Sequence, residues 1–204
     1  MNPLDTYRAL IERGSDPALT LYGAPAGAPR LELSGKVVAN HAAKAANLLA
    51  DDLMLEPGSR LTLDLPVHWR LLTWALGGLL AGAHLAPDGD TVVTSRPAPA
   101  AADVVAVSLG ALDMSWPGDL PAGVIDGNAE LLGQADALLD ASLADASNAS
   151  AFARPDHAAG PRLLVVDPDQ TDLIGLFLHA AVSGTTLVLS DRANAEQARR
   201  LEGL

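Results

Sequence analysis

The fold is decided by residues 31–86, which read LELSGKVVANHAAKAANLLADDLMLEPGSRLTLDLPVHWRLLTWALGGLLAGAHLA. Along this stretch the pattern predicts a short strand, a long helix, a turn, a second strand and a second helix that ends at Gly82. Strands and helices that alternate in this way are typical of α/β folds.

The long helix is indicated by its cap and by its apolar spacing. Ser34 is a good N-cap, because its hydroxyl can accept a hydrogen bond from a backbone N–H of the first turn. Apolar residues then recur at steps of three and four, which is the periodicity of an amphipathic helix; they are Val38, Ala42, Ala45, Leu48, Leu49 and Leu53. We expect one continuous helix from Val38 to Leu53, within a segment about 30 Å long.

A Pro-Gly turn at residues 57–58 leads into the second strand and the second helix. Residues 60–65 alternate polar and apolar side chains, as a half-buried strand does, and Pro66 ends the strand. Residues 67–82 are almost wholly apolar but fall short of the about 20 residues that a membrane span needs. Gly77 and Gly78 indicate a tightly packed helix, with Trp69 and Trp74 in the core.

This order of motifs resembles the N-terminal subdomain of the adenylate-forming enzymes, which include acyl-CoA synthetases, luciferases and adenylation domains. In that family a long helix is followed by Pro-Gly-Asp-Arg-Val, a Leu-Pro-Asn turn and a helix that closes in Ala-Gly-Ala. The corresponding residues here are 57–61 (PGSRL), 65–66 (LP) and 81–83 (AGA). A second match lies at residues 173–201, which are similar to the family's helix, Ser-Gly-Gly-Thr turn, strand and following helix.

The remaining elements are predicted in chain order. We expect a first helix from Pro3 to Gly14, paired strands at 18–22 and 30–33, and a terminal helix at 191–200. Further strands are expected at 84–86, 91–94, 104–108, 162–166 and 185–189, and further helices at 128–143 and 172–182. The predicted fold is α/β, a three-layer arrangement of a largely parallel sheet with helices on both faces. We expect a single domain over residues 1–204, with a mobile loop at 144–161, where large apolar residues are scarce.

Composition restricts the classes of partner. Lys and Arg number 13 against 25 Asp and Glu, so the formal net charge is −12. Such a chain repels phosphate backbones and anionic lipids, so we expect neither nucleic-acid nor membrane partners. The chain has no cysteine, which excludes disulfides and thiolate chemistry. Charged residues throughout positions 1–13 give no secretory signal, so a cytoplasmic location is expected.

The resemblance implies catalytic parts that this sequence does not match. A phosphate-binding loop ending in Pro-Lys should lie between Ser108 and Arg162, yet that interval has no lysine, because Lys36 and Lys44 are the only two in the chain. The family's second catalytic lysine and ribose-binding Asp lie in regions beyond Leu204. The family's Pro-Leu-Phe-His segment aligns with residues 167–170, so its histidine is replaced by Gln170. We therefore expect no adenylation, no catalytic residues and no cofactor.

Other chemistries receive little support from the spacing of residues. The histidines at 41, 68, 84, 157 and 179 contain no pair at metal-ligand spacing, so no metal site is predicted. Ser108 and Gly110 match half of a nucleophile elbow, but Ala106 stands where that motif needs glycine. The aspartates at 167, 169 and 172 could hold a cation, although caps at the start of a helix explain them more simply.

Three hypotheses about function remain. The first is a non-catalytic remnant of an adenylate-forming enzyme that acts as a binding or interaction module. The second is a domain that binds a nucleotide or an acyl group in a cleft at the carboxyl ends of its strands; the candidate ligand-binding residues are Ser108, Asp167, Gln170 and Thr171. The third is an enzyme with an unrecognised site. A protein partner or a homodimer is also expected, through helix ends near Trp74, His179 and residues 191–200.

Overall fold

The computed structural model describes residues 2–99, 103–144, 152 and 160–204. Its helices are α1 (Pro3–Arg13), α2 (Gly35–Asn47), α3 (Trp69–Leu80), α4 (Gly127–Gly133), α6 (Gln170–Ser183) and α7 (Ala195–Glu202). Its strands are β1 (Pro17–Gly23), β2 (Ala28–Ser34), β3 (Arg60–Asp64), β4 (His84–Leu85), β5 (Thr91–Thr94), β6 (Asp103–Ala106), β7 (Val124–Asp126), β8 (Arg162–Val166) and β9 (Thr186–Ser190). The loop expected at 144–161 lies mostly outside the described residues.

The strands form two sheets, whereas the alternation of elements indicated one. The first sheet has the order β2-β1-β9-β8 and the second the order β4-β3-β5-β6-β7. Every pairing is parallel except that of β1 with β2, which is the predicted antiparallel hairpin. The α/β class with largely parallel strands is confirmed. Hydrophobic patterning marks a segment as a strand but does not select its neighbours, which is why the division into two sheets was missed.

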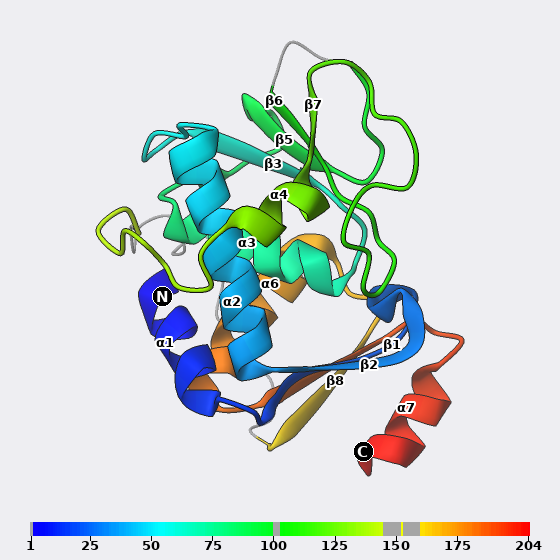
Figure 1. Ribbon diagram of the computed structural model, residues 1–204. Coiled ribbons are helices and arrows are strands. Elements are labelled where there is room, and N and C mark those ends of the chain that lie inside the picture. The colour runs from blue at the N-terminus through cyan, green and yellow to red at the C-terminus, as the bar shows by residue number, and fades with distance from the viewer. Residues whose placement is uncertain (1, 100–102, 145–151, 153–159) are drawn as a thin grey trace.

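The helices lie mainly between the two sheets (Figure 1). Helix α3 packs on β3 and β4, α6 packs on β9, and α3 and α6 contact each other, so the two sheets are joined through helices. Helix α7 lies against the outer face of the first sheet, where Ala198 packs with Tyr22 and Val188.

The long helix begins as predicted and ends in a wider turn. The Ser34 hydroxyl accepts from the Val37 backbone N–H at 3.3 Å. Helix α2 runs on directly into a π-helical turn at Leu48–Asp52, so the helical path is unbroken to Asp52 and stops one residue short of Leu53. Helix α3 begins two residues later than predicted, at Trp69, because His68 is its N-cap.

Close packing of α2 on α3 depends on a glycine in the middle of α3. A Cβ atom built on Gly77 would lie 2.6 Å from the Ala45 Cβ and 2.9 Å from the Ala42 carbonyl oxygen. The predicted tight packing at this glycine is therefore confirmed. Trp69 and Trp74 are 2% and 1% exposed, as expected for core residues, so Trp74 is not available for the association surface proposed near it.

The helix predicted over residues 128–143 is wrong beyond Gly133. Asn47 on α2 is buried, and its amide nitrogen donates to the carbonyls of Ala135 (3.3 Å) and Ala137 (3.0 Å). Its amide oxygen accepts from the Leu139 N–H at 3.1 Å. These bonds take the backbone groups that a continued helix would use, so a tertiary contact overrides the local apolar periodicity.

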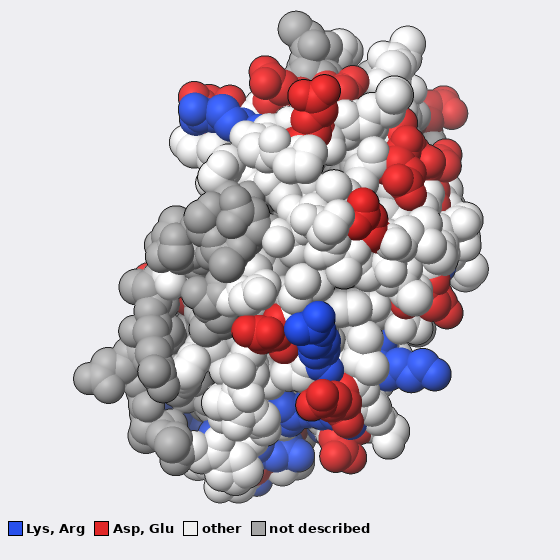
Figure 2. All heavy atoms as spheres, turned by 90° about the vertical axis from the view of Figure 1, so that its left-hand side faces the viewer, with Lys and Arg blue, Asp and Glu red and all other residues white. Residues whose placement is uncertain are grey.

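The charged side chains are unevenly distributed. Figure 2 shows mainly acidic side chains over the upper half of the face in view, with a basic group at the upper left, and acidic and basic side chains intermixed in the lower half. This face therefore offers no extended basic surface to a polyanion. Among the described residues, no helix combines the length and the apolarity needed to cross a bilayer.

Candidate functional site

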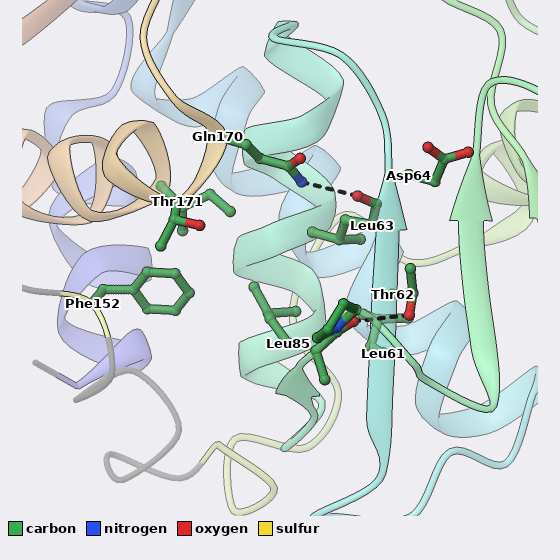
Figure 3. A pocket seen from close by; sticks show the side chains of 11 residues that line it. Leu61, Thr62, Leu63, Asp64, Leu85, Phe152, Gln170 and Thr171 are labelled. Atoms are coloured by element: carbon green, nitrogen blue, oxygen red, sulfur yellow. Dashed lines mark hydrogen bonds between the residues drawn. The ribbon is translucent and has the colours of Figure 1, made fainter.

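The first candidate site is a cavity of about 520 Å³ between the β3–β4 side of the second sheet and the N-terminal half of α6. Figure 3 shows Phe152 and Thr171 on one side and the β3 residues on the other. The lining is largely apolar; it comprises Leu61, Thr62, Leu63, Asp64, Leu85, Ala86, Pro87, Phe152, Gln170, Thr171 and Ile174. A cavity of this size and character is typical of small-molecule sites.

Two polar contacts shape the walls of this cavity. The Gln170 side-chain amide donates to the Leu63 carbonyl at 2.9 Å, which ties α6 to β3. The Thr62 hydroxyl donates to the Ala86 carbonyl at 2.8 Å and accepts from the Gly89 N–H at 2.7 Å. The second pair of bonds fixes the turn that follows β4, so both walls are held in place without a ligand.

Asp64 is the one charged residue among the described residues that line the cavity. Its carboxylate accepts from the Thr94 hydroxyl (2.7 Å) and from the Arg96 guanidinium (2.6 Å). The hydrogen bond from Thr94 and the neighbouring Arg96 lower the pKa of Asp64, so this carboxyl is ionised at neutral pH. Figure 3 shows its carboxylate on the side of β3 away from Gln170. None of the described residues that line this cavity is Lys or Arg.

A second cavity, of about 350 Å³, lies where α2, the start of α3 and α4 meet the loop after β6. It is lined by His41, Lys44, Trp69, Arg70, Ala111, Leu112, Asp113, Met114, Asn128, Leu131 and Leu132. Burial lowers the pKa of Arg70 to about 10, which leaves the guanidinium charged at neutral pH. Burial and the neighbouring cations Arg70 and Lys44 lower the pKa of His41 to about 4, so this imidazole is neutral.

Comparison with solved structures identifies this arrangement. An acyl-CoA synthetase from Brucella canis superposes with a TM-score of 0.71 at 16% identity, over all of this chain and 46% of its own length. The N-terminal domain of FACL13 from Mycobacterium tuberculosis gives 0.65 at 15% identity, over 99% of this chain and 61% of its own. The chain has the fold of the N-terminal region of acyl-CoA synthetases. An artificially fused adenylation–PCP di-domain from Klebsiella oxytoca agrees, with a TM-score of 0.65 at 10% identity over 99% of this chain and 41% of its own.

Sequence comparison is less informative about activity. A protein of Mycobacterium tuberculosis H37Rv, named only as a member of a numbered family, is 35% identical over 126 residues. The match includes 54% of this chain and 50% of that protein, so the chain spans about half the length of the curated relative it matches. No protein-family model matches the chain.

Two of the four predicted ligand-binding residues line the first cavity of this acyl-CoA synthetase-like fold. Gln170 and Thr171 do so from the start of α6. Asp167 does not; it has a positive φ of 44° and lies 3.6 Å from Arg192. The N-cap of α6 is Asp169, whose carboxylate accepts from the Thr171 N–H at 2.8 Å. The interpretation of the acidic residues as caps is therefore confirmed for Asp169.

Ser108 belongs to a buried network instead of a cavity wall. Its hydroxyl donates to the Asp113 carboxylate, and its backbone N–H donates to the Asn128 side chain at 3.1 Å. With its hydroxyl and its N–H both engaged, Ser108 stabilises the loop after β6.

Sequence reasoning missed the apolar wall on β3 and the whole second cavity. Only one signal pointed to the latter: Arg70 is the one charged residue in the apolar run of residues 67–82. Within the described ranges, no cluster of three His, Asp or Glu side chains is placed to hold a metal ion.

Proposed function

We propose that this chain is a binding module with the fold of an adenylate-forming enzyme, and that it does not itself activate carboxylic acids. The proposal is supported by the absence of lysine between Ser108 and Arg162, where the resembled enzymes carry their phosphate-binding loop. It is also supported by Gln170, which stands at the position of the family's histidine and uses its amide to hold β3.

The cavity between β3 and α6 is the proposed binding site, and its chemistry favours an uncharged molecule with an apolar body. Leu61, Leu63, Leu85, Phe152 and Ile174 supply apolar contact, and Thr171 supplies a hydroxyl. The described lining residues include no cation that could bind a phosphate group, and Asp64 adds none, because its carboxylate is paired with Arg96. Of the two ligand classes considered, an acyl group or other neutral body therefore fits better than a nucleotide.

Ligand-induced stabilisation tests this assignment. A ligand at 100 times its dissociation constant adds about 2.7 kcal/mol to the free energy of unfolding, which a thermal-shift assay detects. We expect an increase in Tm with neutral compounds such as adenosine and monoacylglycerols, and none with ATP. Thr171→Trp should fill the cavity and abolish the shift. Val182→Trp, on the same helix but 47% exposed and away from the cavity, should retain it. A shift that survives Thr171→Trp would place the ligand elsewhere.

Pyrophosphate exchange tests the non-catalytic part of the proposal. Short, medium and aromatic carboxylic acids, each assayed with ATP and Mg²⁺, should give no exchange above a no-enzyme blank. Exchange with any of these acids would contradict the proposal.

A further inference from the structure

Arg70 is a buried cation without a carboxylate partner among the described residues. The residue is 4% exposed, and the structure gives its guanidinium one hydrogen bond, from Nη2 to the Asp113 backbone carbonyl at 2.8 Å. Its Nε is buried and has no hydrogen-bond partner within the described chain. An uncompensated buried charge is costly, and proteins normally pair such groups with an ion of opposite sign.

The side chain of Asp113, whose backbone carbonyl accepts from Arg70, is engaged by other donors. The side chain of Asp113 accepts from the Ser108 hydroxyl and from the Gly110 N–H, the latter at 3.2 Å. What Arg70 contacts instead is aromatic: its guanidinium carbon lies 4.5 Å from the centre of the Trp69 ring. A cation–π contact stabilises the guanidinium but does not neutralise its charge.

The second cavity opens beside this guanidinium and has an apolar mouth. Leu112, Met114 and Leu132 all line it and are 77%, 64% and 55% exposed. His41 also lines the cavity, at the edge of the Trp69 ring. A buried guanidinium with exposed apolar side chains around it is complementary to a molecule that has an anionic end and an apolar body.

Lys44 adds positive charge to the same cavity while keeping its own partners. Its Nζ donates to the Gln134 carbonyl at 2.6 Å and lies 3.1 Å from the Asp136 carboxylate. Lys44 therefore already has a counterion in contact, whereas no described carboxylate forms an ion pair with Arg70; the Asp113 carboxylate, which also lines this cavity, acts on Arg70 only through its charge and raises its pKa.

We propose that the cavity between α2, α3 and α4 binds an amphipathic organic anion, with a carboxylate head at Arg70 and an aliphatic body against Leu112 and Leu132. A guanidinium binds a carboxylate through charge-assisted and often bidentate hydrogen bonds. This site is separate from the cavity between β3 and α6, so the two proposals can fail independently.

Calorimetric titration with octanoate and with octan-1-ol tests the site, because the two probes share a chain and differ in the head. Both titrations use the Thr171→Trp variant, because the cavity between β3 and α6 is itself proposed to accept uncharged molecules such as octan-1-ol and is filled in this variant. In that background we expect saturable binding of octanoate and at least tenfold weaker binding of octan-1-ol. Arg70→Met keeps much of the side-chain volume and should bring the two affinities together.

A pair of surface variants keeps the test informative if the Arg70 variant does not fold. Leu132→Glu places a negative charge at the mouth and should weaken octanoate binding several-fold. Leu201→Glu, 56% exposed on α7, is the matched control and should bind octanoate like the unmodified protein. Equal binding of octanoate and octan-1-ol, no saturable binding of octanoate, or octanoate affinity unaffected by Leu132→Glu would each overturn the proposal.

Discussion

The amide nitrogen of Gln170 lies 2.9 Å from the carbonyl oxygen of Leu63, and this hydrogen bond joins a helix that packs on the first sheet to a strand of the second. It also holds one end of the cavity between β3 and α6. The residue that aligns with the resembled family's histidine is thus part of the contact between the two sheets.

Gln170→Ala should destabilise the protein by about 1 kcal/mol, because it removes one intramolecular hydrogen bond from a half-buried carbonyl. Urea unfolding followed by circular dichroism measures the change. Gln134→Ala is the control, since the Gln134 amide contacts the Asp52 carboxylate at the exposed surface, and its effect should be smaller. Equal losses in the two variants would show that the Gln170 bond adds nothing beyond a surface contact.

Gly77→Ala should destabilise the protein although alanine is the better helix former. The added methyl group meets Ala45 and the Ala42 carbonyl at distances that force α2 and α3 apart, and overpacking of this kind costs about 1–3 kcal/mol. Gly133→Ala is a matched control, because a Cβ at Gly133 has no neighbour within 4 Å. Thermal unfolding should show a lower Tm for the first variant and little change for the second. An unchanged Tm for Gly77→Ala would contradict the close packing of α2 and α3.

Stability should fall as the pH is lowered from 6.5 towards 4. Burial, with a further contribution from Arg70, lowers the pKa of both His41 and His68 to about 4, whereas an unfolded histidine has a pKa of about 6.5. Between these values the unfolded chain binds more protons, so each histidine removes up to about 1.4 kcal/mol per pH unit. Urea midpoints at pH 7 and pH 5 measure the slope. His41→Gln should reduce it, and an unchanged slope would exclude His41 as a contributor.

The elements that sequence predicted well are those with local signals. Helix α1 begins after Asn2, whose side chain accepts from the Leu4 N–H at 3.0 Å, and α6 ends at Gly184, which has a φ of 74°. The errors came from long-range contacts. Asn47 ended the helix predicted at 128–143. The Asp191 carboxylate accepts from the Ala24 N–H at 2.9 Å, across the sequence, and also from the Asn194 N–H within a local turn, and α7 starts four residues later than predicted.

Local signals and the family resemblance selected some residues of the candidate site, whereas long-range contacts decided the place of the others. Gln170 and Thr171, which line the first cavity, were selected because ligands bind near the carboxyl ends of strands and because of the family resemblance. Ser108 follows a strand in the same way, but Asp113 and Asn128 engage its polar groups. Arg70 and His41 lie on different helices, and no sequence spacing reveals that both face one cavity.

Self-association through β8 is the last prediction. This strand ends the first sheet, and the described residues place no strand beside its outer edge. Such an edge exposes backbone donors and acceptors. Leu164 lies on this strand, is half-buried, and packs with Tyr22, Val188 and Ala198 beneath α7. We expect light scattering to give a mass above the 20.9 kDa of one chain, increasing with concentration. Leu164→Lys should shift the population towards monomer, whereas Ile11→Lys, 48% exposed on α1, should not. A mass of 20.9 kDa at every concentration would contradict association, and an unchanged dimer in Leu164→Lys would place the interface elsewhere.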